Sequence, residues 1–173
     1  MPLRKLNRLA DYDYSQPGAY FLTVCVKDRA CVLGSIVGAD DHIGPQPNPV
    51  GTDDYIGPHI DLSNVGKIVE KYTCTIPGID QYVIMPNHVH MILRISAKDP
   101  LEGPMWSSAP TDTSIITLVR TWKTLITKEL GVSIWQRSYY DHVIRDEQDY
   151  LTKVQYMINN PAKWYEDQYY CGY

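Results

Sequence analysis

Apolar and polar residues alternate along several short stretches of the chain, a pattern typical of β-strands. Alternation and β-branched residues predict a strand at Ala19–Val26, with Cys31–Val37 as its antiparallel partner across the turn "KDRA". Two more strands are predicted over 79–86 and 88–95, on either side of the Pro86-Asn87 pair. We therefore expect two antiparallel hairpins of strands.

Three longer stretches repeat their apolar residues at helical spacing. One predicted helix covers 62–77, where Ser63 can cap the first turn and Pro77 stops the helix. The second covers 114–131, and the third covers 146–160 with acidic residues in its first turn.

With a short extended segment at 133–138, the predicted order is β-β-α-β-β-α-(β)-α. Strands that come as hairpins separated by helices favour an α+β fold, an antiparallel β-sheet with helices packed on one face. The 173 residues and the 44% hydrophobic fraction fit a single domain over 1–173. Flexible loop insertions are expected at 38–61 and 96–113. The first holds an acidic repeat, "DDHIGP" and "DDYIGP", for which a Ca²⁺ site and a solvated loop are both open interpretations.

The composition of the chain indicates where in the cell the protein is expected and what it can bind. We find no run of 18 apolar residues and recognise no signal peptide, so no membrane span is expected. The four cysteines show no CxxC spacing, which favours reduced thiols and a cytoplasmic location. The net charge of −4 argues against indiscriminate nucleic-acid binding and leaves room for a local basic patch.

Two histidines stand out in the predicted strand over 88–95. His88 and His90 are two residues apart, so their rings project to one face of a strand and Val89 projects to the other. Two imidazoles on one face can hold a metal ion. A pair of histidines on a solvated sheet face is the alternative.

Tyr156 and Asn160 are four residues apart on the last predicted helix and share one helix face. The Asn160 carboxamide oxygen suits a hard cation such as Mg²⁺, and the Tyr156 phenol is a candidate nucleophile. A core tyrosine and an asparagine that caps the helix before proline are the structural alternatives. Tyr139 and Tyr140 compete as nucleophiles, although neither lies four residues before a candidate ligand.

Taken together, these residue types suggest phosphoryl transfer. Two imidazoles and an amide oxygen leave open positions on a divalent ion, where a phosphodiester oxygen can be polarised. A tyrosine beside that ion can attack phosphorus in line. The products are a phosphotyrosine link to DNA and a free 3′-hydroxyl.

The stretch "MPNHVHMIL" resembles the HUH signature of the single-tyrosine IS200/IS605-type transposases, in which U is a hydrophobic residue. Two further stretches, "RKLNRLADYDYSQPGAYFLTVCVKDR" and "WQRSYYDHVIRDEQDYLTKVQYMINNPAKW", resemble the REP-associated tyrosine transposase branch of that family. The resemblance runs from Arg4 to Trp164 and is absent in the two loop insertions.

The resemblance implies a ferredoxin- or RRM-like α/β sandwich with the histidine strand at its centre. It implies that His88 and His90 bind Mg²⁺ or Mn²⁺ and that Tyr156 is the nucleophile. Asn160 takes the place of a polar ligand that is glutamine in the insertion-sequence branch. The implied partner is single-stranded or hairpin DNA, and the chain is expected to be a monomer or a homodimer.

Basic residues are the candidates for contact with DNA phosphates, and each is alternatively an ordinary solvated charge. They lie in the N-terminal arm, on the helix over 114–131 and beside the last helix: Arg4, Lys5, Arg8, Arg120, Lys123, Lys128, Arg137 and Arg145.

Three functions compete for these residues. The first is a metal-dependent endonuclease and strand transferase on single-stranded DNA, a transposase that cleaves near hairpins through a 5′-phosphotyrosine intermediate. The second is a domesticated hairpin-DNA-binding protein with weak or no catalysis. The third, a phosphoesterase, needs two HxT/S motifs, which His42-Ile43-Gly44 and His59-Ile60-Asp61 do not supply.

Overall fold

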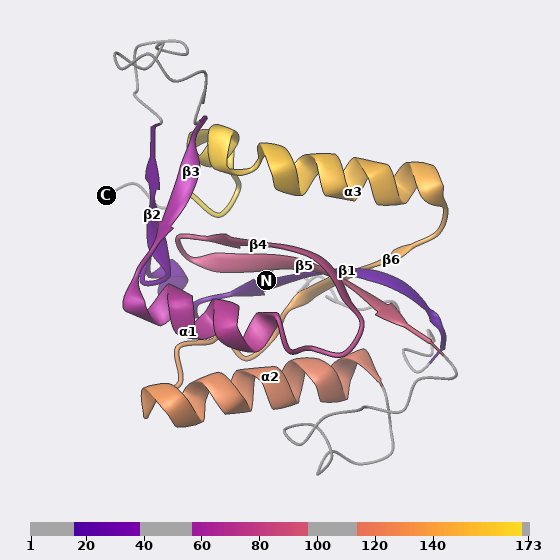
Figure 1. The fold of residues 1–173 in the computed structure, drawn as a ribbon, viewed down its shortest axis with the longest axis horizontal. Coiled ribbons are helices and arrows are strands. Elements are labelled where there is room, and N and C mark those ends of the chain that lie inside the picture. Colours follow the sequence, from indigo (N-terminus) through magenta and orange to yellow (C-terminus); the bar gives the residue numbers. More distant parts are fainter. Residues whose placement is uncertain (1–15, 39–56, 97–113, 171–173) are drawn as a thin grey trace, which may run out of the picture.

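The computed structural model describes residues 16–38, 57–96 and 114–170. Its centre is a four-stranded antiparallel sheet with the strand order β4-β5-β1-β6 (Figure 1). The strands are β1 (Gly18–Cys25), β4 (Ile79–Met85), β5 (His88–Ile95) and β6 (Tyr140–Ile144). The predicted α+β class with an antiparallel sheet is confirmed, as are the predicted strands at the positions of β1, β4 and β5.

All three predicted helices are present in the described part of the chain. They are α1 (Asn64–Thr73), α2 (Ile115–Leu130) and α3 (Glu147–Asn159), which is followed by the 3₁₀ segment η2 (Pro161–Glu166). Each α-helix begins at a residue whose side chain accepts from the backbone N–H three residues further on: Ser63, Ser114 and Asp146. None of the described helices is long and apolar enough to cross a membrane.

The helices cover both faces of the sheet, with α1 and α2 on one face and α3 on the other (Figure 1). The expectation that all helices pack on one face is therefore wrong for α3. The reason lies in the central strands, because a strand that is apolar on both faces needs a cover on each side. In β5, every residue from His88 to Leu93 is buried.

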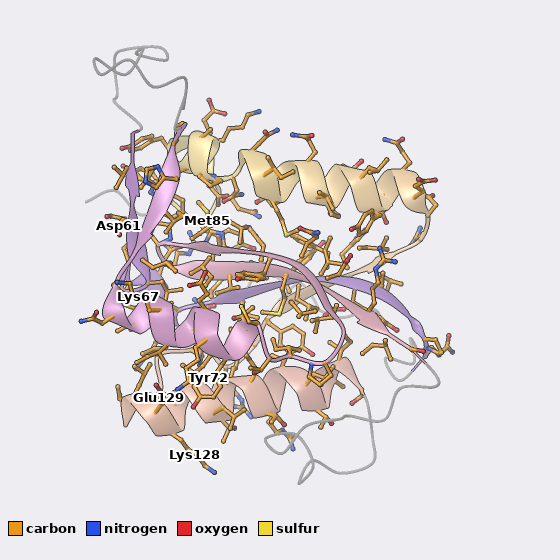
Figure 2. All side chains as sticks on the ribbon, viewed as in Figure 1. Asp61, Lys67, Tyr72, Met85, Lys128 and Glu129 are labelled. Atoms are coloured by element: carbon orange, nitrogen blue, oxygen red, sulfur yellow. The ribbon has the colours of Figure 1, made fainter. Side chains whose placement is uncertain are left out.

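The sheet separates two apolar cores of unequal size. The larger core lies against α1 and α2, where Val89 and Met91 of β5 belong to the same cluster as Trp122 of α2. A hydrogen bond joins the two helices there, because the Tyr72 hydroxyl donates to the Glu129 carboxylate over 2.6 Å (Figure 2). The smaller core lies against α3 and has three buried residues: Phe21, Ile92 and Met157.

A separate two-stranded ribbon, β2 (Gly34–Val37) and β3 (His59–Leu62), stands beside the main sheet (Figure 1). The expectation that Cys31–Val37 pairs with β1 is therefore wrong. The chain turns away after β1 because Asp28 and Arg29 adopt positive φ angles of 55° and 56°. The segment then pairs with β3 instead.

The two predicted loop insertions lie largely outside the described residues. β3 takes up residues 59–61, the end of the first insertion. Residues 39–56, which hold the first copy of the acidic repeat and the first four residues of the second, and residues 97–113 are not described. The single domain over 1–173 with two flexible insertions stays a prediction.

The last strand also differs from the expectation. At 133–138, where the sequence predicts a short strand, the structure has an isolated bridge between Trp135 and Val26. The true strand, β6, begins at Tyr140 and pairs with β1. Lys123 of α2 donates to the Gln136 carbonyl oxygen over 2.7 Å, so this stretch is held to the helix as well as to the sheet.

Candidate metal centre and nucleophile

His88 and His90 open β5 in the interior of the sheet, and their side chains lie on the face that α3 covers. The predicted alternation holds, since Val89 between them belongs to the larger core on the opposite face. His88 is fully buried, and 1% of the His90 surface is exposed. The alternative of two histidines on a solvated sheet face is therefore wrong.

A hydrogen bond at Nδ1 orients each ring. His88 Nδ1 lies 2.8 Å from Asn87 Oδ1, and His90 Nδ1 lies 2.8 Å from Oγ1 of Thr23, its partner residue on β1. The Asn87 Nδ2 group donates to two backbone carbonyl oxygens, which leaves Asn87 Oδ1 as the acceptor. His88 therefore carries its proton on Nδ1 and presents the lone pair of Nε2.

The two Nε2 atoms face each other at a distance of 2.9 Å. Burial lowers the pKa of His88 to about 4 and the pKa of His90 well below its usual value, so both rings are neutral near pH 7. Two ring nitrogens bound at about 2.1 Å and at right angles on one cation lie about 3.0 Å apart. The Thr23 hydroxyl can accept from His90 Nδ1–H, which frees the second Nε2 lone pair. The pair thus fits a shared divalent ion.

Tyr156 and Asn160 share the helix face that is turned toward the histidines, as their spacing predicts. The Tyr156 ring lies 5.1 Å from the His90 ring, and 38% of the tyrosine surface is exposed. Asn160 caps α3 and is 3% exposed, and its Oδ1 atom has no hydrogen-bond partner among the described residues. A buried carboxamide oxygen without a partner is costly, so Asn160 fits the predicted ligand role.

Asp167 joins this cluster, although the sequence did not mark it as a site residue. Its Oδ2 atom accepts from the Tyr156 hydroxyl over 3.3 Å and from Asn160 Nδ2 over 3.0 Å. One ligand atom each from His88, His90 and Asp167 lie within 4.8 Å of one another. No periodicity singles out this acid in "YEDQYY", because it lies beyond the last helix and only the path of η2 brings it to the histidines.

The nucleophile candidate is protonated in this setting. Burial, and then the negative charge of Asp167, raise the pKa of Tyr156 to about 12. At neutral pH the phenol therefore needs an activating group before it can attack phosphorus.

A cleft of about 460 Å³ opens beside the cluster. The two competing nucleophiles differ in their access to this cleft. Tyr140 is 45% exposed and lines it, whereas Tyr139 is 8% exposed and lines a different groove. Tyr156 lines the cleft and also contacts His90. The full lining comes from the sheet, α3 and the segment after η2: Phe21, Thr23, His90, Tyr140, Lys153, Tyr156, Gln168 and Tyr169.

A second groove, of about 400 Å³, runs along α2, the helix on the opposite side of the sheet from α3. Lys123 in this groove is partly buried, and burial lowers its pKa to about 8. Lys128 projects into the solvent (Figure 2). Four of the predicted DNA contacts line this α2 groove: Arg120, Lys123, Lys128 and Arg137.

The other predicted DNA contacts lie elsewhere. Arg145 is exposed just before α3 and lines neither the cleft nor the α2 groove. The three basic residues of the N-terminal arm are outside the described residues: Arg4, Lys5 and Arg8.

Known proteins resemble this chain in sequence and in fold, although no protein-family profile matches it. An uncharacterized protein of Haemophilus influenzae is 32% identical over 186 residues, which cover 96% of this chain and 93% of that protein. A REP-associated tyrosine transposase of Escherichia coli is 29% identical over 86 residues, 49% of this chain and 44% of that protein. The solved structure of a REP-associated tyrosine transposase bound to a REP hairpin matches with a TM-score of 0.55 and 23% identity. That match covers 90% of this chain and 74% of the other, and it confirms the fold class.

Proposed function

Because the chain belongs to an IS200/REP tyrosine transposase-like family, we propose that it is a metal-dependent endonuclease and strand transferase acting on single-stranded DNA near hairpins. One observation carries the proposal. The Tyr156 ring packs beside a buried pair of imidazoles whose Nε2 atoms face each other at 2.9 Å. This is the arrangement that a cation-assisted tyrosine nucleophile needs.

The proposed ligands of the metal are His88, His90 and Asn160. A bound divalent ion, Mg²⁺ or Mn²⁺, supplies Lewis-acid polarisation of a phosphodiester oxygen. The chain prepares for the ion by fixing both rings through their Nδ1 hydrogen bonds and by keeping them neutral through burial. The unpartnered Oδ1 atom of Asn160 supplies a hard oxygen donor.

Tyr156 is the proposed nucleophile. Its hydroxyl oxygen attacks phosphorus, the bond between phosphorus and the 3′ oxygen breaks, and the proton lost by the phenol is balanced by protonation of the departing 3′ oxygen. The products are a 5′-phosphotyrosine link and a free 3′-hydroxyl. One phosphodiester replaces another, so attack by a 3′-hydroxyl can rejoin the strand without a nucleotide cofactor.

The cleft beside the nucleophile is the proposed path of the single strand. Its lining offers aromatic rings for stacking, from Phe21, Tyr140 and Tyr169. Lys153 approaches the Phe21 ring to 5.3 Å and can reach a phosphate in the same cleft.

Hairpin DNA is the proposed partner, which the REP hairpin bound to the solved relative supports. Exposed cations of the α2 groove, Arg120, Lys128 and Arg137, are the proposed contacts to its phosphates, together with Arg145. Lys123 is a weaker candidate, because its ammonium group already donates to the Gln136 carbonyl oxygen. A cytoplasmic location and a monomeric or homodimeric state stay predictions.

The test is the formation of a covalent protein–DNA adduct. Single-stranded oligonucleotides with hairpins from the repeats that flank the gene are incubated with Mn²⁺ or Mg²⁺ and run on a denaturing gel. We expect an adduct with the wild type and with Tyr165→Phe, an exposed tyrosine that lines neither the cleft nor the α2 groove. We expect none with Tyr156→Phe. An adduct that survives in Tyr156→Phe and disappears in Tyr140→Phe would move the nucleophile to Tyr140.

The second candidate function is hairpin-DNA binding with weak or no catalysis. Two observations favour it: the raised pKa of Tyr156, at about 12, and the near-complete burial of both histidines. A binder of this kind retards hairpin oligonucleotides on a native gel and yields no adduct with either metal ion.

A further inference from the structure

Three donors fix the Asp167 carboxylate in place. Oδ1 accepts from the Tyr169 backbone N–H over 2.6 Å, while Oδ2 accepts from the Asn160 amide and the Tyr156 hydroxyl. A carboxylate has about four lone-pair positions. Among the described residues, these hydrogen bonds occupy three of them, which leaves one acceptor position on Oδ1.

The carboxylate lies within reach of the two imidazoles. Ligand atoms of His88, His90 and Asp167 lie within 4.8 Å of one another. Two ligands on opposite sides of one ion at about 2.1 Å are about 4.2 Å apart. The spacing of the three ligand atoms is therefore close to the spacing that one coordination shell requires.

The charge of a divalent cation gives a reason for a carboxylate beside the two histidines. None of the ligands in the proposed function carries a negative charge, because two of them are imidazoles and the third, Asn160, is an amide. Lys153 lines the same cleft as His90, and its positive charge opposes a cation there, whereas the negative charge of Asp167 beside the two histidines favours one. A dication in a buried site without a compensating anion is costly.

We propose that Asp167 is a ligand of the divalent cation, so that the chain holds the ion through two imidazoles, one amide oxygen and one carboxylate. The proposal deepens the proposed function and rests on its metal dependence. It assigns to the segment after η2 a direct part in metal binding. The same carboxylate holds the Tyr156 hydroxyl, so the metal and the nucleophile share one positioning group.

The experiment is a titration of the full chain with Mn²⁺, with the free ion measured by electron paramagnetic resonance and no DNA present. Asp167→Asn keeps the size of the side chain and removes its charge. Glu166→Gln removes the same charge from the neighbouring exposed residue and is the matched control. We expect Asp167→Asn to weaken Mn²⁺ binding by about tenfold or more, and Glu166→Gln to change it by less than about twofold.

Equal Mn²⁺ affinity of the wild type and Asp167→Asn would overturn the proposal, and so would equal weakening in both variants, which would indicate a long-range charge effect. If Asp167→Asn does not fold, a crystal structure of the Mn²⁺-loaded wild type decides. The proposal requires an Asp167 oxygen about 2.2 Å from the ion, and an oxygen beyond bonding distance contradicts it. A wild type that binds Mn²⁺ through Asp167 but forms no DNA adduct leaves this inference standing and removes only the proposed catalysis.

Discussion

On the face of the sheet that α1 and α2 cover, β5 contributes Val89 and Met91 to the larger apolar core. On the face that α3 covers, the same strand contributes His88 and His90 to a polar cluster. Apolar packing on the first face holds the backbone of β5 in place. The packing on the first face therefore fixes the positions of the two histidines, and their rings do not have to anchor the strand.

The two faces also differ in how firmly their helices are attached. The larger core unites residues from the sheet, α1 and α2, whereas α3 is attached through a cluster of three buried residues, its own Met157 and Phe21 and Ile92 of the sheet. We infer that the α1–α2 face supplies most of the stability, whereas part of the α3 face is occupied by the polar cluster around His88 and His90.

Removal of a core residue on each face gives the largest expected contrast. Trp122→Ala deletes a fully buried indole from the α1–α2 face and should lower the free energy of unfolding by about 3–5 kcal/mol. Met157→Ala in the smaller core should cost about 2 kcal/mol. Urea titrations followed by circular dichroism measure both. A loss in Met157→Ala as large as that in Trp122→Ala would break the contrast.

A metal should stabilise the chain through the α3 face alone. Mn²⁺ at about 100 times its Kd should raise the free energy of unfolding by about 2.7 kcal/mol. His90→Ala should abolish this gain, whereas His142→Ala, whose ring pairs with Asp149 outside the cluster, should keep it. Unfolding titrations with Mn²⁺ and with EDTA provide the measurement. A gain that persists in His90→Ala would place the metal elsewhere.

The α1–α2 face should show its own pH dependence through Lys123, whose pKa burial lowers from 10.5 to about 8. The unfolded chain then binds a proton above pH 8 that the folded chain has released, so stability rises with pH. Cys25, whose pKa burial raises from 9.0 to about 11, acts in the opposite direction above pH 9. Between pH 8 and pH 9 we expect the Lys123 contribution to be about 1 kcal/mol.

The control variant for the range from pH 8 to pH 9 is Lys123→Met, in which the free energy of unfolding should not rise with pH in this way. Free energies of unfolding at several pH values from 8 to 9 show the difference between the two slopes. Parallel profiles for the wild type and Lys123→Met would mean that the lysine does not titrate in this range.

The smallest expected effect concerns the exposed cations of the α2 groove. Lys128→Ala should weaken hairpin binding a few-fold and reduce the salt dependence by about one counterion, with stability changed by less than about 0.5 kcal/mol. Lys67→Ala on α1 is the matched control, because that lysine is also exposed and lies away from the groove (Figure 2). Fluorescence anisotropy at several salt concentrations tests this prediction. Equal weakening in the two variants would indicate only a general charge effect.

Residues whose placement depends on local periodicity could be predicted from the sequence. Strand alternation was sufficient to place His88 and His90 on one face, and helical spacing was sufficient for Tyr156 and Asn160. Asp167 could not be found in this way. Its place in the cluster depends on the path of the chain beyond the last helix, which no repeat in the sequence encodes.

Tertiary contacts explain the other differences. The partner of β2 depends on a turn in which Asp28 and Arg29 adopt positive φ, a conformation that residues other than glycine seldom take. Charge patterning identified Lys123 and Lys128 on one helix. It could not tell that one is held against a carbonyl oxygen in the protein while the other faces solvent.

The proposed function requires a metal-dependent tyrosine nucleophile on the α3 face. The most direct measurement is mass spectrometry of the protein after incubation with a hairpin oligonucleotide, with Mn²⁺ or with EDTA, followed by nuclease and protease digestion. We predict a 5′-nucleotide linked through phosphate to Tyr156, present with Mn²⁺ and absent with EDTA. A link to Tyr139 or Tyr140 would rule out Tyr156 as the nucleophile, and a link to Tyr156 that forms equally in EDTA would rule out the metal dependence.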